Sequence, residues 1–451
     1  MISKKRMIIV DNQFDVLVIG TGASGSNAAY QCKSAGMDVA IIDQAPFGGT
    51  CVLRGCDPKK ILHGVSEISE LAGSLGKVFK GSVKIDWGKL IEFKRTFSEG
   101  VPEKREKGFK DNDIAAFKGT AGFTGKNVLS VNDKKLSARF IVIATGSVPR
   151  KLSFPGAELL ITSDVFMENN KLPGEIIFIG GGYISFELAH ISARAGAKVK
   201  IIHRSSRPLK QFDQDVVEMM LEATAKAGIE FIPDVEPDLI KRKGKKLFID
   251  CGVQNYTCDM AVHGAGRVPD TRLLDLEKGH IEEDHGVLVN KYFQSVSNPC
   301  VYAVGDAASI GQPLTPVVSM QGKIAAYNII NGNKKSMDYS LVPSVVFTTP
   351  PMGSVGLTEK QAGQKGLKYR INMADTTRWY NSRRLGFKKT GFKILIDKES
   401  DRIIGAHILA PGAEEVIDFF MLAMKTGIKT SEIKDMIFSY PSGTYDIKYM
   451  V

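Results

Sequence analysis

The apolar positions of the chain form two similar stretches, each with the order strand, glycine-rich turn, helix, strand. In the first, the apolar run Phe14–Ile19 precedes a turn at Gly20–Gly25, a helix of small residues to Ala35 and a second strand, Val39–Asp43. A short apolar run bounded by turn residues is typical of a strand in a parallel sheet. This stretch therefore predicts a βαβ unit.

The second stretch repeats this order further along the chain. The strand Ile176–Ile179 leads into the turn Gly180–Ser185, a helix to Ala195 and the strand Lys198–Ile202. A glycine-rich turn between a strand and a helix is the fingerprint of a dinucleotide-binding βαβ unit. Two such units predict an α/β protein with two Rossmann-like dinucleotide-binding domains.

The C-terminal part of the chain has a different pattern. Strand-like runs occur at Ser344–Phe347, Gly391–Ile396 and Arg402–Leu409, and Ala413–Thr426 has the pattern of a helix. Alternating strands followed by helices are typical of an antiparallel sheet in an α+β domain. Because this part carries no nucleotide motif, we expect it to serve in assembly of the protein.

The composition narrows the class of protein. Of 451 residues, 43% are hydrophobic and 24% are charged, which excludes disordered, collagen-like and membrane-spanning classes. No apolar run approaches the ~18 residues of a membrane helix, so we expect a cytoplasmic protein. The net charge of +11 favours anionic partners such as pyrophosphates. The basic run Lys241–Lys246 has no interleaved aromatic side chains, which favours a solvated turn over a nucleic-acid site.

The glycines of the two turns suit a close approach to a phosphate group. Gly20, Gly22 and Gly25 in the first turn, and Gly180 and Gly182 in the second, allow backbone N–H groups to approach a pyrophosphate. Ser185 stands in place of the third glycine of the second turn, where we expect slightly looser packing of the helix against the strand.

The residues that end the second strand of each unit indicate which nucleotide binds. Asp43 ends the first unit, and a carboxylate there accepts both hydroxyls of an unmodified ribose, which suits FAD. The second unit has His203 and Arg204 instead, with Arg207 and Lys210 close behind. Such cations can hold a 2′-phosphate, so we expect NADPH rather than NADH. The alternative is a basic surface loop without this role.

Two cysteines come after the first βαβ unit, within Gly48–Lys60. In a regular helix Cys51 and Cys56 would point about 140° apart, too far from each other for a disulfide. A bond between them therefore requires a distorted turn, which Gly49 and Gly55 permit, and a strained disulfide is easily reduced. The alternative is two unrelated thiols.

The segment Gly48–Lys60 closely resembles the redox loop of the class I pyridine nucleotide–disulfide oxidoreductases, the family of glutathione reductase, dihydrolipoamide dehydrogenase and mercuric reductase. Four further segments resemble other motifs of this family: Ile141–Gly146, Gly264–Pro269, Val301–Ala307 and Pro343–Phe347. The resemblance extends from about Phe14 to the C-terminus.

The resemblance implies a division into domains and a set of cofactor contacts. Residues 1–150 and 270–340 would form the FAD-binding domain, 151–269 the NAD(P)-binding domain, and 341–451 an interface domain that makes a homodimer. Besides the turn glycines, the positions that match cofactor-binding residues of the family are Gly49, Thr50, Thr145, Gly146, Gly266, Arg267, Gly305 and Asp306, the last beside the ribityl chain of the flavin.

The resemblance also implies catalytic roles. Tyr183 matches the residue that gates the nicotinamide pocket, and Lys59 and Glu187 match an ion pair beside the flavin. Cys56 matches the sulfur next to the flavin, and Cys51 matches the interchange thiol that meets the substrate. An ammonium group beside the flavin would stabilise its anionic reduced form.

The chain departs from the family beside the cysteines. Arg54 and Asp57 stand where the family usually has a small or neutral residue and an apolar one. A cation lowers the pKa of a nearby thiol and a carboxylate raises it, so we expect an altered redox potential or substrate.

A second departure lies near the C-terminus. The family carries a His-Pro-Thr-x-x-Glu motif there, whereas this chain has Tyr440–Asp446, and its last histidine is His407. Tyrosine can donate a proton but is a poor base at neutral pH, so we expect slow turnover of glutathione disulfide or lipoamide. Tyr440 would orient a ligand or donate a proton, with Asp446 as its carboxylate partner. The alternative is a segment that serves only in packing.

Three functions remain open from the sequence. The main hypothesis is an FAD enzyme that passes electrons from NADPH to the Cys51–Cys56 disulfide and on to a disulfide or other thiol-reactive acceptor. Reduction of a thiophilic metal ion, or attack by the Cys51 thiolate on another centre, is the second. A flavin-binding redox sensor is the third. Cys32, Cys251 and Cys258 are expected to be buried thiols, and no bound metal or nucleic-acid partner is expected.

Overall fold

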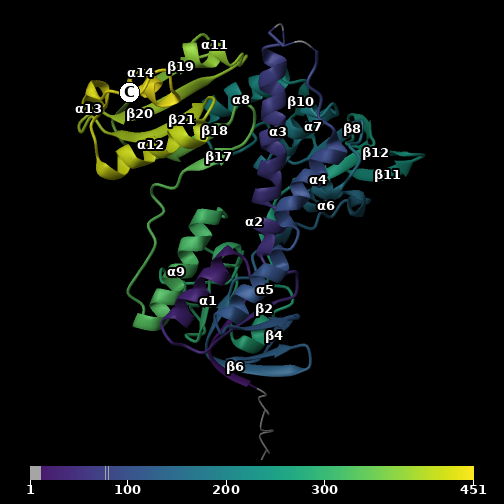
Figure 1. Cartoon of the computed structure of the whole chain (residues 1–451), viewed down its shortest axis with the longest axis vertical. Helices are drawn as coiled ribbons and strands as arrows, with labels where there is room; N and C mark the ends of the chain where they lie inside the picture. Colours follow the sequence, from purple (N-terminus) through teal and green to yellow (C-terminus); the bar gives the residue numbers. More distant parts are fainter. Residues whose placement is uncertain (1–11, 77, 80) are drawn as a thin grey trace, which may run out of the picture. The chain divides into compact units, whose positions relative to one another are not determined.

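The structure is a computed structural model that describes residues 12–76, 78–79 and 81–451 (Figure 1). These residues form two compact units, each assembled from three segments of the chain. The first unit comprises the described residues up to Pro58, Arg95–Arg150 and Arg267–Tyr339, and the second comprises Lys59–Lys94, Lys151–Gly266 and Ser340–Val451.

A seven-stranded sheet forms the centre of the first unit. Its strands lie in the order β3-β2-β1-β6-β5-β4, and β16 also pairs with β6. The pairs that join β1, β2, β3, β6 and β16 are parallel, as the βαβ pattern predicts. The strands are β1 (Asn12–Ile19), β2 (Val39–Asp43), β3 (Ala115–Lys118), β4 (Ala121–Gly125), β5 (Val128–Val131), β6 (Lys134–Ile143) and β16 (Val301–Ala303).

Two helices of the first unit pack closely against each other. These are α1 (Ala23–Ser34) and α9 (Thr315–Asn331). A Cβ atom on Gly322 would lie 2.2 Å from the carbonyl oxygen of Ser24, so only glycine allows this approach. The other elements of this unit are α2 (Gly49–Arg54), α5 (Val101–Asp111), the strand pair β7 (Ser147–Pro149) and β15 (Arg267–Pro269), and the 3₁₀ turns η2 (Leu276–Gly279) and η3 (Gly305–Ala307). Helices α3 (Cys56–Ser74) and α4 (Trp87–Ser98) have residues in both units.

A four-stranded parallel sheet in the second unit contains the second βαβ pattern. Its order is β10-β9-β8-β14, and α7 begins directly after the glycine-rich turn. A three-stranded antiparallel sheet, β11-β12-β13, lies in the same unit. The elements are η1 (Ala157–Leu159), α6 (Ser163–Glu168), β8 (Glu175–Ile179), α7 (Tyr183–Arg194), β9 (Lys198–Ile202), α8 (Gln214–Lys226), β10 (Ile229–Ile232), β11 (Leu239–Lys243), β12 (Lys246–Asp250), β13 (Asn255–Cys258) and β14 (Met260–His263).

The C-terminal part of the second unit is a five-stranded antiparallel sheet with helices. The sheet order is β17-β18-β21-β20-β19, and α12 packs against β18 and β21 (Figure 1). The elements are β17 (Ser344–Val346), β18 (Met352–Gly356), α10 (Glu359–Gln364), β19 (Tyr369–Asp375), α11 (Tyr380–Arg384), β20 (Gly391–Asp397), β21 (Ile403–Leu409), α12 (Ala413–Thr426), α13 (Thr430–Asp435) and α14 (Gly443–Met450).

A buried lysine joins this sheet to α8. Lys393 on β20 is 2% exposed, and its Nζ atom forms ion pairs with Asp213, at 3.1 Å, and with Asp215 and Glu359. Burial alone would lower the pKa of Lys393, but the three carboxylates raise it well above its usual value. The lysine therefore stays charged in the interior of the second unit.

The predicted fold class is confirmed: two Rossmann-like βαβ units and a C-terminal antiparallel α+β part are present. None of the helices in the described part of the chain has both the length and the apolar character that crossing a bilayer requires.

Candidate functional site

The first glycine-rich turn packs directly on the backbone around it. Gly20 has a φ of +112°, and a Cβ atom on it would lie 2.2 Å from the carbonyl oxygen of Ala144. A Cβ atom on Gly25 would lie 2.0 Å from the carbonyl oxygen of Gly20. Gly22 caps α1, and a Cβ atom on Gly49 would lie 2.4 Å from the Cα atom of Gly22. The bare backbone of two loops thus meets at the N-terminus of α1, where an anion binds best.

Two polar groups lie beside this turn. Asp43 accepts hydrogen bonds from the N–H and hydroxyl of Thr21, at 2.8 and 2.6 Å, and from the N–H of Ala45 at 2.9 Å. The Oγ1 atom of Thr145 is buried and has no hydrogen-bond partner in the described part of the chain. A buried hydroxyl without a partner is costly, so this atom suits a bound polar ligand.

A chain of hydrogen bonds leads to Asp306. Arg267 Nε donates to Ser147 Oγ at 3.0 Å, and Ser147 Oγ donates to Asp306 at 2.7 Å. Gly305, in the same turn as Asp306, has a φ of +70° and donates its N–H to the side chain of Gln321 at 2.7 Å. Ser147 was not predicted, because Arg267 and Asp306 lie 120 and 159 positions away from it in the sequence.

The residues of the first unit fit FAD. At Gly20, Gly25 and Gly49 neighbouring backbone lies where a Cβ atom would be, so only glycine allows the two loops to meet at the start of α1, and Thr145 offers a hydroxyl without a partner in the described part of the chain. Asp43 and Asp306 retain lone pairs for ribose and ribityl hydroxyls. Thr50 in α2 and Gly146, whose φ is +72°, lie in the loops next to the two motifs.

Ser185 in the second glycine-rich turn packs directly against Gly264. Gly180 has a φ of +116°, and a Cβ atom there would lie 2.4 Å from the carbonyl oxygen of Gly264. Ser185 is fully buried, and a Cβ atom on Gly264 would lie 1.9 Å from its Oγ atom. Gly264 therefore leaves the space that the Ser185 hydroxyl occupies. Gly266, with a φ of +102°, and the α7 cap Gly182 complete the turn region.

The loop after β9 presents cations around a neutral histidine. Gly181 N–H donates to His203 Nδ1 at 3.0 Å, and a Cβ atom on Gly181 would lie 2.7 Å from the His203 ring. Burial and the charges of Lys210 and Arg204 lower the pKa of His203. Arg204 and Lys210 themselves are exposed. This loop can therefore offer cations to a phosphate outside the glycine turn.

The two cysteines share a partner in the first unit. Gly55 interrupts the helix between α2 and α3, and a Cβ atom on it would lie 2.8 Å from the carbonyl oxygen of Thr50. The hydroxyl of Thr315, at the start of α9, lies 3.0 Å from Cys51 Sγ and 3.3 Å from Cys56 Sγ. The helix is thus interrupted between the two cysteines, and both are free thiols in this structure, so the Cys51–Cys56 bond stays a prediction. Thr315 was missed because it lies 259 positions from Cys56.

The electrostatics of Cys51 favour the thiol form. A hydrogen bond with Cys56 and burial raise the pKa of Cys51, the charge of Asp57 raises it further, and the hydrogen bond from Thr315 opposes them. Cys51 Sγ also donates to Asp57 Oδ1 at 3.8 Å. The predicted direction of the Asp57 effect is confirmed.

A buried glutamate pairs with two lysines in the second unit. Glu187 on α7 is 1% exposed, and its Oε2 atom lies 2.8 Å from Lys59 Nζ and 2.6 Å from Lys60 Nζ. Its Oε1 atom accepts the N–H of Phe347 at 3.0 Å. Burial alone would raise the pKa of Glu187, but the two ammonium groups lower it to about 2. Lys59 Nζ also lies 4.7 Å from the ring centroid of Tyr183.

The second lysine was not predicted. Lys60 Nζ lies 3.6 Å from the ring centroid of Phe347, whereas the sequence suggested only Lys59 as the partner of Glu187. The adjacent pair of lysines was the available signal. Burial and the Lys60 charge lower the pKa of the neighbouring His63 to about 4, so this histidine is neutral at pH 7.

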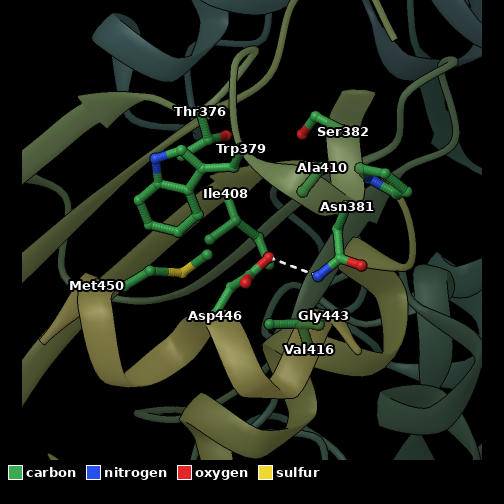
Figure 2. A pocket seen from close by; sticks show the side chains of 11 residues that line it. Thr376, Trp379, Asn381, Ser382, Ile408, Ala410, Val416, Gly443, Asp446 and Met450 are labelled. Atoms are coloured by element: carbon green, nitrogen blue, oxygen red, sulfur yellow. Dashed lines mark hydrogen bonds between the residues drawn. The ribbon is translucent and has the colours of Figure 1, made fainter. Parts of the chain in front are cut away.

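The C-terminal residues have different partners from those expected. Tyr440 is 64% exposed, and its ring contacts those of Tyr445, at a centroid distance of 4.9 Å, and Tyr380, at 5.9 Å. Asp446 instead accepts a hydrogen bond from Asn381 at 2.8 Å, in a small pocket between α11, α12 and α14 (Figure 2). The predicted pairing of Tyr440 with Asp446 is therefore wrong. Asp446 lies one residue beyond Tyr445 on α14, and its side chain turns into the domain.

The remaining cysteines with predicted positions are buried, as expected. Cys32 lies on α1 and Cys258 on β13, and burial raises the pKa of each to about 12. Burial raises the pKa of Cys251 to about 11. Thiols with such pKa values are poor nucleophiles at neutral pH.

Two known protein-family profiles match almost the whole chain. The profile of the pyridine nucleotide-disulphide oxidoreductases matches residues 14–326, and the profile of the dimerisation domain of the same group matches residues 342–451.

Several individual proteins are also similar to this chain over most of its length. A mercuric reductase of Lysinibacillus sphaericus is 30% identical over 96% of this chain and 81% of its own length. A glutathione reductase of Burkholderia cepacia is 32% identical over 91% of this chain and 92% of its own length. The HOCl-induced flavoprotein disulfide reductase RclA from Escherichia coli superimposes with a TM-score of 0.88 at 25% identity, covering 97% of this chain and 99% of that one.

Proposed function

Because this chain belongs to the pyridine nucleotide-disulphide oxidoreductase family, we propose that it passes electrons from NADPH to the Cys51–Cys56 pair and on to a disulfide or another thiol-reactive acceptor. The family uses FAD and NAD(P)H, so the protein is an FAD-dependent NAD(P)H oxidoreductase. Bound FAD would accept hydride from the nicotinamide and transfer an electron pair to the disulfide.

The observation that carries this proposal is the common hydrogen-bond partner of the two sulfurs. Thr315 Oγ1 lies within 3.3 Å of both Cys51 and Cys56. The same unit contains the glycine turn and the Thr145 hydroxyl that fit FAD. A pair of thiols in one hydrogen-bonded site can form and break a disulfide, whereas two separated thiols cannot.

Lys59 and Glu187 support the same reaction. Two ammonium groups share one carboxylate, so the cluster carries a net positive charge that would stabilise an anionic reduced flavin. Tyr183, in contact with Lys59, is the proposed gate of the nicotinamide pocket.

The test is a screen of acceptors with holoenzyme and NADPH. The panel comprises glutathione disulfide, lipoamide, bis-coenzyme A disulfide, Hg(II) and Cu(II). Cys51→Ser should abolish reduction of every acceptor while NADPH still bleaches the flavin, and the control Cys300→Ser should behave as the wild type. Unchanged turnover in Cys51→Ser would refute the proposal, and bleaching without turnover of any acceptor would favour a redox sensor.

The preference for NADPH rests on the loop after β9. Arg204 and Lys210 are exposed beside His203, whose Nδ1 atom accepts a hydrogen bond from the N–H of Gly181. His203 stands where the first unit has a carboxylate, so this position cannot accept the two ribose hydroxyls in the same way. Replacing both cations by alanine should raise the KM for NADPH more than tenfold and leave the KM for NADH almost unchanged. A wild-type enzyme that prefers NADH would refute this assignment.

A homodimer is proposed from the dimerisation domain. In this arrangement Tyr440, exposed on the C-terminal part, would approach the thiol pair of the partner subunit. Tyr440→Phe should then lower turnover of the acceptor in a pH-dependent manner, and equal rates from pH 6 to 9 would remove a proton-donating role. Analytical ultracentrifugation tests the dimer itself.

Reduction of a thiophilic metal ion is the second candidate. The similarity to mercuric reductases over almost the whole chain favours it. The Hg(II) and Cu(II) arms of the screen decide between the two.

A further inference from the structure

The interchange thiol needs a proton acceptor that the C-terminal segment does not supply. In this chain a tyrosine, a poor base at neutral pH, occupies the position of the motif histidine. Among the described residues, the polar partners of Cys51 Sγ are Thr315, Cys56 and Asp57.

Only one of these three groups can carry a proton to and from the substrate. The Thr315 hydroxyl already donates to Cys51, and a hydroxyl is a far weaker base than a carboxylate. Cys56 is needed as the second sulfur of the disulfide. Asp57 Oδ1 lies 3.8 Å from Cys51 Sγ with the sulfur as donor, and Asp57 is exposed on the first turn of α3.

We propose that Asp57 is a catalytic residue that exchanges a proton with Cys51 and the leaving thiol. This inference rests on the proposed function, since it assumes that reduced Cys51 attacks a disulfide. It places the proton acceptor and the interchange thiol on the same subunit, six positions apart.

The proposed exchange takes place in two steps. Cys51 attacks one sulfur of the disulfide RSSR′ and its proton passes to the Asp57 carboxylate as the new S–S bond forms. The bond between the two substrate sulfurs breaks, and R′S⁻ takes the proton from Asp57 and leaves as R′SH. The Cys56 thiolate then attacks Cys51 in the mixed disulfide, forms the Cys51–Cys56 bond and releases RS⁻, which is protonated by solvent. Two electrons have passed from the two cysteines to the substrate.

The basicity of a carboxylate relative to a thiolate determines which disulfides should depend on Asp57. A carboxylate is a weaker base than a thiolate, so proton loss from Cys51 must accompany S–S bond formation. The resulting carboxyl group then protonates a basic leaving thiolate with a favourable driving force. Replacing Asp57 also removes the charge that raises the pKa of Cys51, so more Cys51 is ionised and the lost proton acceptor is offset with either disulfide. Asp57 should therefore matter for disulfides that release an alkyl thiolate, which needs the returned proton, and should matter little for those that release a stable aryl thiolate.

The experiment compares Asp57→Asn with wild-type holoenzyme reduced by NADPH. The acceptors are bis(2-hydroxyethyl) disulfide, which releases an alkyl thiolate, and 5,5′-dithiobis(2-nitrobenzoate), which releases an aryl thiolate. We expect about a 10²-fold slower reaction of Asp57→Asn with the alkyl disulfide and a change of less than threefold with the aryl disulfide. Asp57→Glu should recover part of the rate, and the exposed control Asp111→Asn should match the wild type on both.

Alkylation of Cys51 by iodoacetamide, in a Cys56→Ser background, measures the reactivity of the Cys51 thiol when no thiolate has to leave. Because the charge of Asp57 raises the pKa of Cys51, Asp57→Asn should alkylate at least as fast as its parent. Equal slowing with both disulfides, or faster reaction with both, would overturn the proposal in favour of a structural or purely electrostatic role. Turnover of either disulfide by Cys51→Ser would instead overturn the proposed function.

Discussion

Glu187→Gln tests the buried ion-pair cluster of Glu187, Lys59 and Lys60 in the second unit. The substitution keeps the size of the side chain but removes the negative charge that Lys59 and Lys60 share. Glu187 and Lys59 are almost completely buried, so water cannot replace the lost interaction. The expected result is a marked loss of stability of this unit.

The magnitude comes from the pKa of Glu187. The pKa is about 2 in the folded protein, against a usual value of 4.5. At about 1.4 kcal/mol for each tenfold change in the proton-binding constant, the interaction contributes about 3 kcal/mol at pH 7. Breaking a buried ion pair by removing one partner costs about 3–5 kcal/mol, which agrees.

The pH dependence has a definite sign. Because folding lowers the pKa of Glu187, its contribution is complete above about pH 4.5 and is lost as the pH falls towards 2. The difference in unfolding free energy between the wild type and Glu187→Gln should therefore shrink from about 3 kcal/mol at pH 7 to about 1 kcal/mol at pH 3.

The two tryptophans provide the assay. Trp87 and Trp379 are the only tryptophans of the chain, and both belong to the second unit. Urea unfolding monitored by tryptophan fluorescence therefore reports on the unit that contains Glu187. Glu218→Gln, an exposed substitution on α8, is the control. A Glu187→Gln variant within 0.5 kcal/mol of that control at pH 7 would refute the reasoning, as would a difference that does not change with pH.

Three further outcomes are expected. Lys393→Met leaves three carboxylates without their cation and should cost at least about 3 kcal/mol in the same fluorescence assay; a smaller loss would contradict the network. Gly55→Ala places a Cβ atom 2.8 Å from the carbonyl oxygen of Thr50, and should slow acceptor reduction at least tenfold without changing flavin bleaching by NADPH; equal rates of acceptor reduction would show that the turn adapts. Asn381→Ala removes the partner of Asp446 and should increase amide hydrogen exchange in α14, whereas unchanged protection would show that the helix is held by its apolar face.

Short-range patterns in the sequence were sufficient to predict secondary-structure elements and the two glycine-rich turns. The strand Val39–Asp43 and the helix Ala413–Thr426 occur with the predicted bounds. These patterns act within a few residues: a buried strand requires a continuous apolar run, and a backbone that approaches a pyrophosphate requires glycine. The need for a distorted turn between Cys51 and Cys56 could also be predicted, because the two cysteines are close together in the sequence.

Contacts between distant segments were decided only by the tertiary structure. Thr315 reaches both sulfurs because α9 begins beside the α2–α3 turn, and Ser147 reaches Arg267 because β7 pairs with β15. Ser185 fits because Gly264, on another loop, lacks a side chain. Asp446 turns inward to Asn381 because one residue along a helix rotates a side chain by about 100°. A linear pattern states which chemical groups are available, but the partner of each group depends on how the chain returns to it in three dimensions.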